Sequence, residues 1–120
     1  MIGSVILLVA TGLLLILLSL PMIRRRVKPN ALYGLRIAAT FADEWVWYEA
    51  NARSGWDLLI LGTVQVVLAV ILPLFRGLSL DAYLLTNAGV MLVGTVVCCI
   101  IGSRRANRLL KESRQALPRT

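Results

Sequence analysis

Six residues between positions 30 and 51 carry the side chains of this sequence that are best suited to recognition chemistry. The arginine is always charged and presents a planar fork of donors. The asparagines both donate and accept hydrogen bonds, and the tyrosine and tryptophan join an apolar body to a polar tip. The glycine permits a positive φ or a close backbone approach. We therefore predict one polar binding cluster, with Arg36 at its centre, formed by Asn30, Tyr33, Gly34, Arg36, Trp47 and Asn51.

A structural role for Arg36 stays open beside the binding role. The same stretch of chain contains Asp43, Glu44 and Glu49. A guanidinium near a bilayer needs acceptors, and an ion pair with one of these acids would serve to fold the connector. The two roles are compatible.

Catalysis is not expected from this composition. The chain contains no histidine, the commonest general base and a common metal ligand. Cys98 and Cys99 are adjacent and lack the spacing of a zinc site or a redox pair, so we interpret them as packing residues. An enzyme would have to combine Arg36 with one of four acids, Asp43, Glu44, Glu49 or Asp57. We expect no enzyme, no cofactor and no metal ion.

Three long apolar runs surround this stretch. They are Ile2–Ile23, Leu58–Phe75 and Ala82–Ser103. Each is long enough for a helix to cross the hydrocarbon core of about 30 Å. With 58% hydrophobic residues in 120, the chain has too little polar surface to cover such helices in water. We predict an all-α membrane protein with one membrane domain over residues 1–120, a motif loop at 24–57 and a basic tail at 104–120.

The basic residues predict the orientation. Six of the 13 lie in the first connector and six in the tail, whereas the second connector has Arg76 alone. Because basic residues near span ends stay in the cytoplasm, the N-terminus should face out and the C-terminus in. The net charge of +7 then sets the topology and attracts anionic lipid head groups. We therefore expect a lipid bilayer rather than nucleic acid as the partner.

The first connector also contains a helical pattern. Thr40 and Asp43 form a capping-box pattern, and Gly55 is placed as a C-cap. Between them, Phe41, Trp45, Tyr48 and Ala52 recur at helical spacing. We predict a cytoplasmic amphipathic helix over Phe41–Ser54, lying at the membrane interface.

Polar and small residues within the spans indicate helix packing. Gln65, Thr86, Asn87 and Thr95 are expected to hydrogen-bond between helices rather than to line a transport path, because no carboxylate accompanies them. Counting from the span ends places Gln65 near mid-membrane and Asn87 nearer the outer face, which argues against a pair. The tail is expected to extend the third helix, graze the membrane and fray at Pro118.

The connector resembles the signature of the SdpI family of small bacterial membrane proteins, in its minimal three-span form. The matching pattern is Pro29-Asn30-x-x-Tyr33-Gly34-x-Arg36, then Thr40, then Trp47-x-x-x-Asn51-x-x-x-Gly55. The namesake of that family is an immunity protein against a secreted toxic peptide, and it draws a repressor to the membrane. The resemblance implies an immunity or accessory protein of the bacterial cytoplasmic membrane, with a toxic peptide or a cytoplasmic repressor as partner.

Two further readings stay open. The alternative function is a small transporter or a lipid-binding subunit of a larger membrane complex, with Arg36 holding an anionic head group. A homo-oligomer is also compatible with the sequence.

Overall fold

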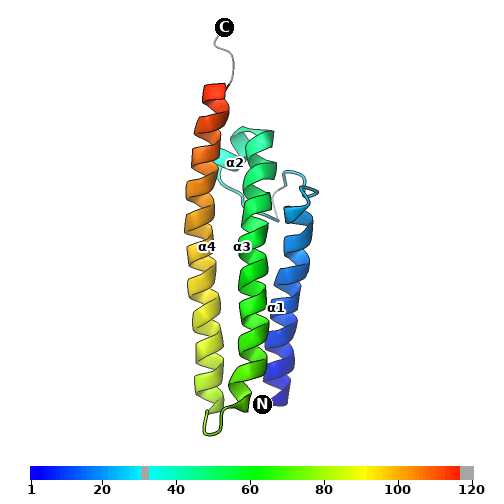
Figure 1. The fold of residues 1–120 in the computed structure, drawn as a ribbon, viewed down its shortest axis with the longest axis vertical. Helices are drawn as coiled ribbons and strands as arrows, with labels where there is room; N and C mark the ends of the chain where they lie inside the picture. The colour runs from blue at the N-terminus through cyan, green and yellow to red at the C-terminus, as the bar shows by residue number, and fades with distance from the viewer. Residues whose placement is uncertain (31–32, 117–120) are drawn as a thin grey trace.

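The computed structural model describes residues 1–30 and 33–116. Three long helices run along an elongated molecule of 68 × 22 × 20 Å, and in Figure 1 α3 lies between α1 and α4. The described part of the chain is helical and contains no strand. Its elements are α1 (Ile2–Ile23), α2 (Ala38–Ala42), α3 (Glu44–Ile71), the short 3-10 helix η1 (Leu72–Leu74) and α4 (Leu80–Ala116).

The predicted fold class is confirmed. All three predicted spans lie in helices that are long and apolar enough to cross a membrane. The N-terminus lies near the turn that joins α3 to α4, whereas α4 ends at the opposite end of the molecule, where α2 also lies. We call these the hairpin end and the connector end.

The separate interfacial helix is not found, because α3 is one continuous helix from Glu44 to Ile71. Gly55 does not end a helix. It lies within α3, where an added Cβ would come within 2.9 Å of Ile23 Cγ1. The glycine therefore serves the close approach of α1 and α3. The helix begins later than predicted, at Glu44, after the N-cap Asp43, whose side chain accepts from the Trp45 backbone N–H at 2.8 Å.

The buried face of the first turns of α3 also differs from the predicted apolar face. Phe41 and Trp45 are 55% and 49% exposed, whereas Val46 and Trp47 are fully buried. The apolar face was placed by spacing alone. The actual buried face is set by the neighbours that α3 meets, namely α2, the connector and the end of α4.

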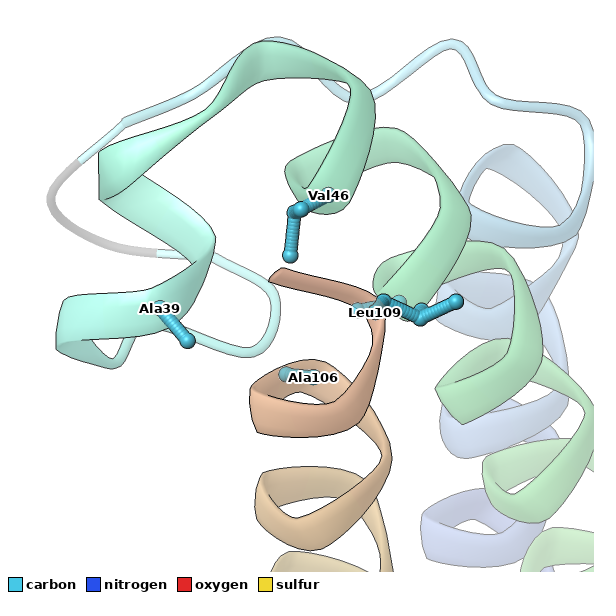
Figure 2. Packing of buried hydrophobic residues seen from close by; sticks show 5 residues of the cluster. Ala39, Val46, Ala106 and Leu109 are labelled. Atoms are coloured by element: carbon cyan, nitrogen blue, oxygen red, sulfur yellow. The ribbon is translucent and has the colours of Figure 1, made fainter. Parts of the chain in front are cut away.

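These neighbours form a small core outside the predicted spans (Figure 2). Ala39 of α2 packs with Val46 and Ala50 of α3 and with Ala106 and Leu109 of α4. We name this unit the connector cap: α2, residues 44–54 of α3 and residues 104–116 of α4. It exists because α4 continues past its membrane-spanning part to Ala116, as predicted for the tail. Leu117 and Pro118, where fraying was predicted, lie outside the described residues.

Two polar contacts hold α4 in the cap. Ser113 Oγ donates to Asp43 Oδ2 at 2.5 Å, and this bond is the main reason that the pKa of Asp43 lies below its usual range. Arg105 Nη1 lies 3.1 Å from Asp57 Oδ2, at the base of the cap. The tail is thus docked onto α3.

Between the spans, close backbone contact and buried hydrogen bonds join the helices. A Cβ added to Gly12 would lie 2.8 Å from the Gly62 carbonyl oxygen, so α1 and α3 nearly touch there. Gln65 Nε2 donates to Asn87 Oδ1 at 3.1 Å, and both side chains are fully buried. Our depth argument against this pair is wrong. The helix α3 ends at Ile71, before Pro73, so Gln65 lies closer to the hairpin end than a span to Phe75 implies.

Candidate functional site

Asn51 fastens the connector to α3. Its Oδ1 accepts from the Leu35 backbone N–H at 2.6 Å, and its Nδ2 donates to the Trp47 carbonyl at 2.9 Å. The side chain is only 2% exposed. A buried amide has to use its donors and acceptors, so the position of Leu35 is tied to the rotamer of Asn51.

Trp47 fastens a second point of the same connector. Its ring is fully buried, and its indole N–H donates to the Val27 carbonyl at 2.8 Å. Trp47 and Asn51 are one helical turn apart on α3. They therefore hold the two ends of the connector, around Val27 and around Leu35, against one face of the helix.

Gly34 is required at its position for two reasons. Its φ of +100° lies in a region that residues with a side chain rarely adopt. An added Cβ would also lie 2.7 Å from Asn51 Oδ1. The glycine thus lets the backbone pass directly over the asparagine.

Asn30 and Tyr33 shape the turn that leads to Gly34. Asn30 Oδ1 accepts from the Tyr33 backbone N–H at 2.7 Å, and Asn30 Nδ2 donates to the Lys28 carbonyl at 2.8 Å. The Tyr33 hydroxyl donates to the Leu18 carbonyl of α1. Burial raises the pKa of Tyr33, so the hydroxyl keeps its proton as a donor.

Thr40 is a part of this cluster whose role the sequence did not indicate. The sequence predicts it as part of a capping box for a helix over Phe41–Ser54. Instead, its hydroxyl accepts from the Ile37 backbone N–H at 3.0 Å and lies 2.9 Å from the Leu35 carbonyl, to which it can donate. Its position in the pattern that resembles the family signature, between Arg36 and Trp47, was the one sign in the sequence that Thr40 belongs to this cluster.

Arg36 lies apart from the buried centre. Its side chain is exposed, and Asn51 occupies the centre that we predicted for the arginine. Among the predicted acidic partners, Glu49 pairs with Arg25 at 2.6 Å and with Arg53 at 3.3 Å. Five of the six predicted residues therefore help to fix the connector on the helices, whereas the Arg36 side chain is exposed.

A hollow of about 310 Å³ lies below this unit, and we call it the loop cavity. The connector forms its roof, while α1, α3 and α4 form its walls. The Ser54 hydroxyl oxygen, at its edge, is buried and has no hydrogen-bond partner among the described residues. The roof and walls include Tyr33, Gly34, Leu35, Leu18, Met22, Ser54, Leu58, Thr95 and Cys99.

The loop cavity suits an apolar ligand. Its lining is mostly apolar, and the buried Ser54 hydroxyl is among its few polar groups. Within the described ranges, no group of three His, Cys, Asp or Glu side chains is placed to hold a metal ion. The arrangement can bind and orient an apolar group.

The fold and this cluster define a multi-pass helical membrane protein whose first connector is folded onto the spans. Residues 26–103 match the SdpI/YfhL protein family, and the match covers more than half of the chain. The chain belongs to this family. No curated protein and no solved structure gives a significant match.

Proposed function

We propose that this protein is an immunity or accessory protein that binds an apolar peptide segment in the loop cavity. The segment belongs to a toxic peptide or to a partner membrane protein. The observation that carries the proposal is the roof of the cavity. Tyr33 and Leu35 are fixed by hydrogen bonds to α1 and α3, and together with Gly34 between them they line the hollow between the spans.

Two features support binding as the role of this cluster. The hydrogen bonds of Asn51 and Trp47 hold the connector in one conformation, and preorganisation lowers the entropy cost of binding. The walls come from three helices, so an apolar side chain entering from the bilayer would gain packing contacts without losing hydrophobic burial. Family membership supports the same role, since the namesake confers immunity.

Orientation is part of the proposal. We infer that the connector cap faces the cytoplasm of a bacterial cell, with the N-terminus outside, because the basic residues gather at this end. The loop cavity would then open to the inner half of the bilayer, where an inserting peptide would arrive after crossing.

The test fills the cavity without disturbing its roof. Thr95 is exposed on α4 and lines the cavity, so Thr95→Phe should occupy the space meant for the ligand. The measurement is growth of a host exposed to the cognate toxic peptide, beside the membrane abundance of each variant. We expect Thr95→Phe to lose protection by at least about tenfold in the tolerated peptide concentration, the equivalent of about 1.4 kcal/mol of binding.

Thr63→Phe is the matched control. Thr63 is also exposed on a membrane helix, its hydroxyl bonds within its own helix to Leu59, and it does not line the cavity. It should protect as well as the native protein. Full protection by Thr95→Phe at normal abundance would exclude the loop cavity as the peptide site. Lipid that copurifies in the cavity, together with unchanged protection, would instead favour the lipid-binding alternative.

A further inference from the structure

A second hollow lies between α3 and α4, outside the proposed peptide site. It has a volume of about 630 Å³, and we call it the lateral groove. On α4 it runs from Leu85 to Cys98, which is roughly 20 Å of helix. Leu61 and Cys98 line both hollows, and the other lining residues differ.

The lateral groove has one charged end and a long apolar remainder. Asp57 lines it at the connector end, where its carboxylate pairs with Arg105 at 3.1 Å. Both side chains keep partial exposure, 23% for Asp57 and 18% for Arg105. Below this pair the walls are apolar, with Ile60, Val64 and Val93 among them.

Gly89 indicates that the groove is not a by-product of internal packing. An added Cβ there would meet nothing within 4 Å, whereas one at Gly94 would collide with Leu61. Glycine weakens a helix interior by about 1 kcal/mol relative to alanine. Packing against Leu61 explains why position 94 is a glycine. No internal contact among the described residues explains the glycine at position 89.

We propose that the lateral groove binds one zwitterionic, amine-bearing phospholipid. One acyl chain lies along the groove, whose length exceeds the roughly 15 Å of one leaflet's hydrocarbon. The ammonium of the head group meets Asp57, and the phosphodiester meets Arg105, since guanidinium suits phosphate geometry. The ion pair between them uses one atom from each side chain, and both side chains are partly exposed, so the second carboxylate oxygen and the other guanidinium nitrogens are available to a head group.

This charge arrangement selects among lipids. An anionic head group without an amine would meet the Asp57 carboxylate with repulsion, and a diacylglycerol would leave both charges without a new partner. The inference does not depend on the proposed peptide binding, because it concerns a different hollow.

The experiment is native mass spectrometry of the delipidated full chain in detergent. The protein is titrated with phosphatidylethanolamine, phosphatidylglycerol and diacylglycerol that carry the same acyl chains. We expect phosphatidylethanolamine to bind about tenfold more tightly than the other two, the effect of one charge-assisted contact.

Two variants distinguish the contribution of the lipid's acyl chain from that of its head group. Gly89→Leu should fill the groove and weaken binding of phosphatidylethanolamine about tenfold, a loss of the size expected for one displaced apolar contact. The matched control is Gly3→Leu, since Gly3 also has nothing within 4 Å and lies on α1, away from the groove. Asp57→Asn should still bind the acyl chain of the lipid but lose the preference for phosphatidylethanolamine over phosphatidylglycerol.

Thermal unfolding of each variant accompanies the titrations. Equal binding of all three lipids to the native protein would overturn the proposal. So would unchanged phosphatidylethanolamine binding by Gly89→Leu, or a change from dimer to monomer in that variant, which would assign the groove to a second copy of the chain.

Discussion

Asn51 joins the connector to its own helix, α3, with the two ends of one amide group. Its oxygen holds Leu35 and its nitrogen holds the Trp47 carbonyl. The sequence predicted that the two asparagines, the tyrosine and the tryptophan would gather, because polar side chains beside a bilayer need partners. It misplaced the centre. Charge suggested Arg36, but a guanidinium is costly to bury, whereas a neutral amide satisfies backbone groups at lower desolvation cost.

Gly34→Ala tests this centre. The added methyl would strain a backbone at φ +100° and collide with the oxygen of Asn51. We expect a loss of about 2–4 kcal/mol in the free energy of unfolding, from strain and a broken buried hydrogen bond. Gly89→Ala, in open space on α4, should be neutral or stabilising by up to about 1 kcal/mol. Chemical unfolding in detergent gives both values, and equal stability of Gly34→Ala and the native chain would refute this account.

Arg36 carries a separate prediction, because its exposed position separates binding from folding. Arg36→Lys keeps the charge and loses the planar fork, and Arg36→Ala loses both. Surface changes usually shift stability by no more than about 0.5 kcal/mol, so both variants should accumulate and fold normally. If Arg36 contacts the partner, both should lose growth protection. Full protection by both at normal abundance would leave the arginine without a functional role.

At the scale of elements, α3 shows where sequence patterns mislead. Gly55 looked like a helix end because glycine commonly follows one. The structure uses it for close packing against α1. In the structure, the buried positions 47, 51, 55, 62, 65 and 69 continue at helical spacing through the glycine. Whether a glycine ends a helix or lets a neighbour approach depends on a partner that lies more than thirty residues away in the chain.

The Gln65–Asn87 pair is the prediction at this scale. In hydrocarbon such a bond contributes about 0.6–2 kcal/mol, because no water replaces it at the buried Gln65 Nε2 and Asn87 Oδ1 atoms. A double-mutant cycle with Gln65→Leu and Asn87→Leu should give a coupling energy in that range, measured by unfolding in detergent.

The control cycle replaces Gln65→Leu by Thr63→Leu, since Thr63 is exposed and bonds within its own helix. Its coupling to Asn87→Leu should be near zero. Additive effects in the first cycle would mean that the bond contributes nothing to the joining of α3 and α4.

At the scale of the molecule, apolar runs were sufficient to predict three membrane-crossing helices, since the length needed to cross a bilayer is fixed. The connector cap was not predictable from these runs. Its core of Ala39, Val46, Ala50, Ala106 and Leu109 combines two segments with short apolar side chains. Neither segment shows a strong pattern by itself, and only their meeting buries them.

Orientation is the prediction for the whole molecule. In a chain with Cys98 and Cys99 replaced by alanine, Ser79→Cys lies at the hairpin end and Glu112→Cys lies in the cap, both at exposed positions. Neither change removes a basic residue. A membrane-impermeant thiol reagent applied to intact cells should label Ser79→Cys and spare Glu112→Cys. The reverse labelling would place the N-terminus inside.

The connector cap also imposes an order on biosynthesis. Ser113 bonds to Asp43, 70 residues earlier in the chain, so the cap cannot close while α4 is still being made. It can close only when α3 and α4 have both crossed the bilayer, because only then does the end of α4 lie on the same side as α2. A chain in which one helix fails to insert would keep Val46 and Ala50 uncovered in water. The closed cap is therefore a structural sign that both helices have inserted.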